Sequence, residues 1–223
     1  MVELPFTTDD FLQLFASYNE AIWPTQIAAY ILGVLVIFTV LKGYRKSEGI
    51  VNQIVGLFWL WMGVIYHISF FTEINPAAYL FGSLFIIQGI LFLFLNVLGY
   101  SLGYTYENNV YSHTGSLFIF YAMVIYPLLG VAFGHNYPAS PVFGVAPCPT
   151  TIFTFGLLLW ARNKVPFWLF IIPFLWSLIG LSAALQLSIY EDIVLPATGI
   201  ISLVLILYRN QNLQKEEPIV SLK

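Results

Sequence analysis

Three side chains of this sequence are candidates to bind a soft transition metal. Cys148 stands between two prolines in the segment Pro147-Cys148-Pro149, where the stiff backbone would hold its thiol in a fixed position. His67 and His135 supply imidazole groups, which together with a thiolate select Cu(I) or zinc. The alternative is a buried, hydrogen-bonded histidine and a small apolar cysteine. A metal site of His67, His135 and Cys148 is therefore a hypothesis that depends on the fold bringing the three together.

The composition indicates what kind of protein must position these residues. Of 223 residues, 59% are hydrophobic and 9% are charged, whereas soluble domains carry about 25% charged residues. So little charge cannot cover a water-soluble globule, which excludes a soluble enzyme and a disordered chain. With 8 Lys and Arg against 11 Asp and Glu, there is no basic surface for a nucleic acid. The sequence indicates an integral membrane protein whose partner is the lipid bilayer.

Apolar stretches predict an all-α fold, a polytopic bundle of about seven transmembrane helices that forms one domain over residues 1–223. Crossing about 30 Å of hydrocarbon needs roughly 20 residues. The fifth stretch has only 13 residues and is too short to cross alone. The seven stretches are 26–41, 50–71, 77–99, 115–133, 149–161, 166–186 and 193–208.

The basic residues predict the orientation of this bundle. With seven spans, the first loop, the fifth loop and the C-terminal tail share a side, and all 8 basic residues fall there. The positive-inside rule then places the N-terminus outside, the C-terminus inside and residues 210–223 in a cytoplasmic tail. Seven of the 11 acidic residues would face outward and attract cations. The same pattern also follows from the positive-inside bias alone, without any ligand.

Residues 1–24 predict a short interfacial segment. Thr7 or Thr8 can cap a helix in which Phe11, Phe15 and Tyr18 recur at helical spacing. A short helix packed against the bundle is the alternative. The first residues lack the basic start of a signal peptide, so we expect no cleaved leader.

The fourth loop, residues 133–151, has an unusual composition. It contains four prolines and two glycines in 19 residues, yet many of its other residues are apolar. We expect it to fold back into the bundle, where non-helical backbone is either buried or lines a cavity. The short fifth helix would then begin below the membrane surface, with Thr150 and Thr151 satisfying its free N–H groups. A structural plug without a ligand is the alternative.

These placements predict an outward-facing polar pocket at the start of the short fifth helix. A helix N-terminus favours an anion whereas nearby carboxylates favour a cation, so the sign of the ligand's charge stays open. The candidate ligand-binding residues are Glu20, His67, Glu73, Asn75, His135, Tyr137, Cys148, Thr150 and Glu191, with Asp192 beside them. Gly63 shares a helix face with His67, and a partner helix could approach closely there.

Several short segments resemble an uncharacterised family of bacterial multi-pass membrane proteins. They are Tyr18-Asn19-Glu20-Ala21-Ile22-Trp23-Pro24, Glu73-Ile74-Asn75-Pro76-Ala77, Phe133-Gly134-His135, Tyr137-Pro138 and Pro147-Cys148-Pro149-Thr150-Thr151-Ile152-Phe153. The resemblance covers nearly the whole chain and implies a location in the bacterial inner membrane. The family is a domain of unknown function, so it implies no activity, cofactor or site residue.

Two functional hypotheses from different classes follow. The first is a small transporter or binding protein for a cation or a small polar solute. The second is a structural or accessory membrane subunit that packs against partner proteins or forms a homo-oligomer. A metal-dependent membrane enzyme is a third and weaker hypothesis, because the sequence has no paired-histidine motif.

Overall fold

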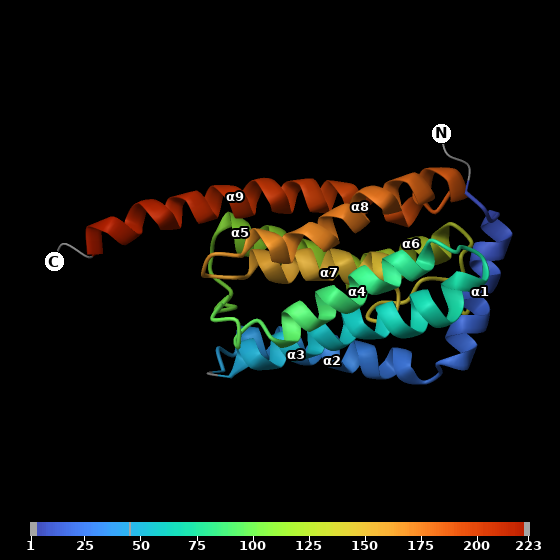
Figure 1. Cartoon of the computed structure of the whole chain (residues 1–223), viewed down its shortest axis with the longest axis horizontal. Coiled ribbons are helices and arrows are strands. Elements are labelled where there is room, and N and C mark those ends of the chain that lie inside the picture. Colours follow the sequence, from blue (N-terminus) through green and yellow to red (C-terminus); the bar gives the residue numbers. More distant parts are fainter. Residues whose placement is uncertain (1–3, 45, 221–223) are drawn as a thin grey trace.

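The computed structural model describes residues 4–44 and 46–220, in which helices are joined by short turns and loops (Figure 1). The α-helices are α1 (Thr8–Ala21), α2 (Thr25–Leu41), α3 (Ser47–Trp61), α4 (Ala78–Leu93), α5 (Val110–Phe120), α6 (Tyr126–Ala132), α7 (Pro147–Leu159), α8 (Phe167–Leu187) and α9 (Val194–Val220). Two π-helical segments, η1 (Met62–Phe70) and η3 (Tyr121–Ile125), continue α3 and join α5 to α6. Short 3₁₀ turns, η2 (Phe71–Glu73) and η4 (Tyr190–Ile193), follow η1 and precede α9.

The helices α2 to α9 run along the length of the molecule, whereas α1 lies across one end (Figure 1). The chain bends by 85° between α1 and α2. Thr7 caps α1, because its hydroxyl accepts from the Asp10 N–H at 3.2 Å while the Asp10 carboxylate accepts from the Thr7 N–H at 2.9 Å. The hydrogen bonds from the Thr7 backbone and hydroxyl hold the pKa of Asp10 below its ordinary value. The N-terminal helix and its cap, both predicted from sequence, are present.

The short helix α7 lies at the centre of the bundle, packed against α5, α8 and α9. All of its residues except Cys148 are buried. Its 13 residues span about 20 Å, and the loop before it is also buried at Phe143, Val145 and Ala146. The second half of the fourth loop therefore folds back into the bundle, as its composition predicts, whereas Phe133 and Tyr137 in its first half are exposed.

Glycines allow helices of this bundle to meet backbone to backbone. A Cβ added to Gly63 of η1 would lie 2.9 Å from the carbonyl oxygen of Gly82 of α4, and one added to Gly82 would lie 2.9 Å from that of Gly63. The same reciprocal approach occurs in the pairs Gly56–Gly89 and Gly115–Gly156. The close helix contact expected at Gly63 is therefore present, with α4 as the partner.

All seven predicted stretches are helical, but helix length supports fewer membrane crossings. Four helical segments are long and apolar enough to cross: Ser47–Glu73, Val110–Ala132, Phe167–Leu187 and Tyr190–Lys215. The bent pair of α1 and α2 is a fifth if it counts as one span, while α4 and α7 are apolar but shorter. The helix in the stretch predicted at 77–99 is shorter than that stretch, because α4 ends at Leu93 and the apolar residues after it form turns.

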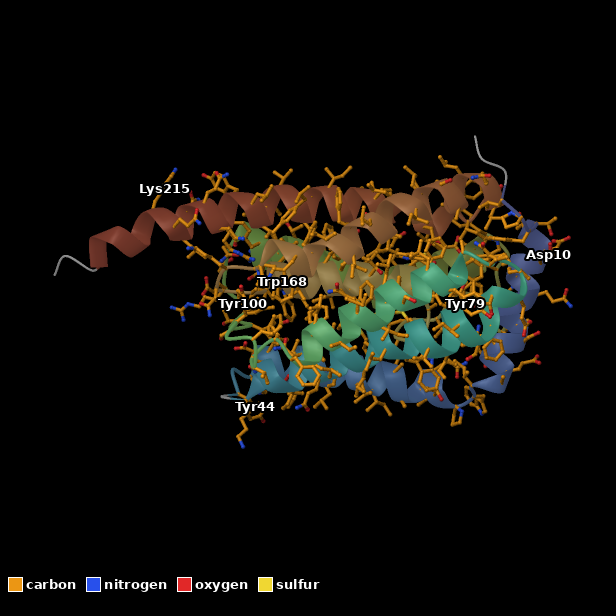
Figure 2. All side chains as sticks on the ribbon, in the orientation of Figure 1. Asp10, Tyr44, Tyr79, Tyr100, Trp168 and Lys215 are labelled. Carbon is orange, nitrogen blue, oxygen red and sulfur yellow. The ribbon has the colours of Figure 1, made fainter. Side chains whose placement is uncertain are left out.

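The basic side chains gather at the end of the bundle away from α1. Figure 2 shows Lys215 and Tyr44 towards this end and Asp10 on α1 at the other. The basic residues among those described are Lys42, Lys46, Arg162, Lys164, Arg209 and Lys215, which follow α2, follow α7 or lie late in α9. The bundle thus has a basic end and, at the opposite end where α1 lies across it, an acidic end.

Candidate functional site

The acidic end of the bundle holds two consecutive buried carboxylates. Glu191 and Asp192 lie in η4, the turn between α8 and α9, with exposed fractions of 0% and 4%. A 3₁₀ turn has three residues per turn, so neighbouring side chains point about 120° apart. The two carboxylates therefore reach different partners.

Glu191 ties η4 to the loop that follows α6. Its Oε1 lies 2.9 Å from Nδ1 of His135, whose side chain is 11% exposed. The hydroxyl of Tyr121 donates to the backbone carbonyl of Glu191 at 2.8 Å. The second carboxylate oxygen, Oε2, has no hydrogen-bond partner among the described groups. His135 is thus the donor that compensates the buried Glu191 carboxylate.

Asp192 faces a pocket of about 240 Å³. The Tyr126 hydroxyl donates to its Oδ1 at 2.5 Å, the Cys148 thiol lies against the same carboxylate, and the Trp176 indole lies next to that thiol. Six aromatic residues make up much of the remaining wall: Phe6, Phe11, Phe15, Tyr66, Phe71 and Phe81. The predicted polar pocket is therefore an aromatic one, in which Asp192 is the charged residue of the described lining.

The two π-helical segments shape this end of the bundle. In an α-helix, Tyr121 and Tyr126 would point about 140° apart, because they are five residues apart. The π-helical turns of η3 carry an extra residue and bring both tyrosines onto η4, one to Glu191 and the other to Asp192. In the same way η1 carries Tyr66, which lines the pocket.

Helix α1 holds the fourth loop in place beside the pocket. The hydroxyl of Tyr18 donates to the carbonyl of Val145 at 2.8 Å. The side-chain amide of Asn19 donates to the carbonyls of Pro138 at 2.6 Å and Ser140 at 2.8 Å. Because the prolines interrupt regular secondary structure in this loop, these carbonyls have no helical N–H partner, and polar side chains of α1 donate to them instead.

The two threonines at the start of α7 do not satisfy the N–H groups of their own helix. The Thr150 hydroxyl accepts from the Gly144 N–H at 2.9 Å and donates to the Ala146 carbonyl at 2.7 Å. It therefore closes the loop and does not cap the helix, because Thr150 is the fourth residue of α7, whose capping position is Ala146. The Thr151 hydroxyl is buried without a partner among the described groups.

Four further candidate residues lie at the same end with different surroundings. Glu20, Glu73 and Tyr137 are exposed and are not among the pocket's lining residues. The ring of Tyr137 instead packs against Trp23 at a centroid distance of 6.4 Å. Asn75 does line the pocket, although its side-chain oxygen accepts from the backbone two residues on at 3.0 Å.

The structure does not assemble His67, His135 and Cys148 into a metal site. His67 is fully buried and its ring contacts those of Phe85 at 4.6 Å and Trp176 at 5.2 Å, on α4 and α8. The imidazole of His135 instead lies against Glu191 of η4. Among the described residues, no group of three or more His, Cys, Asp and Glu side chains could hold a metal ion.

The sequence pattern does not identify Tyr126, Trp176 or the aromatic wall as site residues. The helical spacing of Phe11 and Phe15 is visible in the sequence and predicts one apolar face on α1. Spacing predicts a face but not what it covers. The pairing of Tyr126 with Asp192 depends on a π-helical segment that the sequence pattern does not announce.

The fold and site define a class: an all-helical protein with at least four helices able to cross a membrane and an aromatic pocket around a buried carboxylate. Within that class, the chain belongs to a family of unknown function, DUF6064, whose model matches residues 8–217. This confirms the resemblance to an uncharacterised family. No curated protein and no solved structure matches the chain.

Proposed function

We propose that this chain is a seven-span protein of a bacterial inner membrane, with its N-terminus outside, that binds a small organic cation in the Asp192 pocket. It would act as a small transporter or as a binding protein. The observation that carries the proposal is a buried carboxylate set in a wall of aromatic rings.

The helix arrangement supports seven spans. The shorter helices α2, α4 and α7 are apolar and run alongside the four long segments (Figure 1). The buried loop before α7 also lies inside the bundle, so the loop and α7 together can cover the thickness of the hydrocarbon layer. The basic end would face the cytoplasm and α1 would lie at the outer surface.

The surroundings of Asp192 favour a cation over an anion. Burying a carboxylate is costly unless a positive group or several hydrogen bonds compensate it. The charged groups that act on Asp192 are the carboxylate of Glu191 and the imidazole of His135, and the latter already bonds to Glu191. Cys148, whose thiol lies against Asp192, belongs to the first turn of α7. The Asp192 carboxylate therefore already lies at the positive, N-terminal end of that helix, which leaves that end less free for an anionic ligand.

The wall and the size of the pocket favour an organic cation. Aromatic faces attract cations such as alkylammonium groups, whereas hydrated calcium or magnesium needs six or more oxygen ligands. The described lining offers few oxygens besides those of Asp192. A volume of about 240 Å³ lies below the roughly 300–1,000 Å³ of sites for drug-sized ligands. The pocket therefore suits an ammonium compound with few heavy atoms.

Titration with tetramethylammonium tests this proposal. The full chain in neutral detergent is expected to show a saturable change in tryptophan fluorescence, because Trp176 lines the pocket. The neutral isostere tert-butyl alcohol should give no saturable change. Asp192→Asn is expected to weaken binding about tenfold or more, since a hydrogen bond or contact to a charged group contributes roughly 1.5–3 kcal/mol.

Glu73→Gln is the matched control for this titration, because it removes an exposed acid at the same end of the bundle. It should leave the tetramethylammonium affinity unchanged. An equal response to tert-butyl alcohol, or an unchanged affinity in Asp192→Asn, would refute the cation site. The chain would then be better described as a structural or accessory membrane subunit.

Cysteine labelling tests the orientation. In a Cys148→Ala background, a membrane-impermeant maleimide added outside intact cells is expected to label a cysteine at position 73 and not one at position 46. The reason is that Glu73 lies at the acidic end and Lys46 at the basic end, and both are exposed. Labelling at position 46 from outside would overturn the proposed topology.

A further inference from the structure

The basic end of the bundle contains a second hollow, of about 290 Å³. It lies between the start of α5, the end of α7, the loop before α5 and the late part of α9. Its polar lining residues include Thr105, Glu107, Asn109, Ser112, Arg162 and Arg209. This hollow is at the opposite end from the Asp192 pocket and shares no lining residue with it.

Arg209 is a buried cation against which no carboxylate lies among the described side chains. It is 7% exposed. Its Nη1 donates to the carbonyl of Leu159 and its Nη2 to that of Leu158, both at 3.1 Å, so the guanidinium caps the C-terminal end of α7. Its Nε has no partner among the described groups. The guanidinium also lies over the ring of Tyr111, with its Cζ 5.5 Å from the ring centroid. Carbonyls, a helix terminus and an aromatic face supply only partial negative charge, so the described groups leave most of the positive charge uncompensated.

Two further features of the hollow suit an anion. Arg162 presents a second guanidinium to the same space. The first turn of α5 also opens there, with Asn109 as its cap accepting from the Ser112 N–H at 2.9 Å. The remaining N–H groups of a first helical turn have no partner inside the helix and bind anions readily.

One acidic group opposes this field. The Glu107 carboxylate lines the hollow, accepts from the Asn109 amide at 3.1 Å and lies 4.0 Å from Nε of Arg162. It is half exposed, and two guanidinium groups stand against this one carboxylate. The balance of charge among the described lining residues is positive.

We infer that this hollow binds a phosphate-type anion, carried either by an anionic lipid headgroup or by a small soluble phosphate compound. Guanidinium groups match the geometry of phosphate oxygens, with two parallel hydrogen bonds available from one face. The apolar lining residues, among them Leu159, Trp160 and Leu213, would border an acyl chain or the non-phosphate part of a soluble ligand. The inference does not depend on cation binding at the other end.

Thermal unfolding of the full chain in neutral detergent tests the inference and separates the two sources. One arm adds inorganic phosphate, with chloride at equal ionic strength as its control. The other adds phosphatidylglycerol to the micelles, with a neutral monoacylglycerol as its control. A midpoint raised by phosphatidylglycerol alone identifies a lipid headgroup, and one raised by phosphate identifies a soluble ligand. No stabilisation in either arm overturns the inference.

Variants show whether the stabilisation arises at this hollow. Arg209→Met is expected to weaken the apparent affinity about tenfold or more, because it removes a charged donor. Arg162→Gln changes an exposed residue that can be replaced without loss of folding, and it should weaken the affinity several-fold. Lys215→Gln removes an exposed basic charge from α9, the helix that also carries Arg209, and is the matched control. Equal weakening in Arg162→Gln and Lys215→Gln would indicate general charge attraction and overturn the site.

Discussion

Gly63→Ala is expected to cost about 3 kcal/mol of the free energy of unfolding, at the upper end of what overpacking costs. The added Cβ would lie 2.8 Å from Cγ1 of Ile86 and 2.9 Å from both the Gly82 carbonyl oxygen and the Ile86 backbone nitrogen. Two of these atoms are backbone, so no side-chain rotation relieves the contact and α4 must move away from η1. A lower thermal midpoint and less monodisperse protein in size-exclusion chromatography would measure the loss.

Gly49→Ala is the matched control, since Gly49 and Gly63 lie in the same continuous helical segment, Ser47–Glu73. A Cβ at Gly49 would meet nothing within 4 Å. Alanine is the better helix former by about 0.8–1 kcal/mol, so this variant should be as stable as the parent or slightly more so. Equal losses in the two variants would show that helix approach at Gly63 does not limit stability.

The same glycines illustrate what the sequence predicts about the fold. Small residues at Gly63 and Gly82 predict close helix contact, and the structure shows it. The apolar stretches likewise predict every long helix, because lipid-facing and buried positions are both hydrophobic. Helix length is less predictable. Apolar residues such as Leu95 and Val97 continue past the end of α4 into turns, and composition alone cannot distinguish the two.

Helix α1 shows a second limit of sequence reasoning. Its capping residues and its apolar face are predictable from local chemistry, and Thr7 and Phe11 play the expected roles. The 85° bend after it is a property of the whole packing arrangement. Only with that bend do Phe11 and Phe15 become the wall of a pocket.

The sequence predicts at which end of the bundle the candidate site lies, but not which of its side chains contact one another. Loop order places His135, Cys148 and Glu191 at one end, and the structure brings His135 to Glu191 and Cys148 to Asp192. Sequence spacing does not give the direction in which a side chain points around its helix. Each π-helical turn shifts that direction for the residues that follow. His67 lies within such a segment and points into aromatic rings.

The second large effect is expected from His135→Ala. Glu191 is fully buried, one of its oxygens has His135 as a donor, and the other has no partner among the described groups. Alanine would leave the carboxylate buried without compensation, and breaking a buried pair in this way costs about 3–5 kcal/mol. The free energy of unfolding, from denaturant titration in mixed micelles, measures the loss.

His113→Ala is the control. That histidine is exposed at the basic end of the bundle, and among the described residues its ring bonds to Tyr106 and Asn108 of its own segment. Its loss should cost about 0.5 kcal/mol or less.

The double variant His135→Ala with Glu191→Gln separates the buried charge from simple packing. An amide carries no charge, so replacing Glu191 by glutamine removes most of the penalty that alanine at position 135 exposes. We therefore expect the double variant to be more stable than His135→Ala alone, with a coupling free energy of about 1–3 kcal/mol between the two positions. Losses that simply add would mean that Glu191 finds another donor when His135 is absent. In that case Tyr121 holds η4 against η3, packing holds the loop after α6, and the histidine is dispensable for the fold.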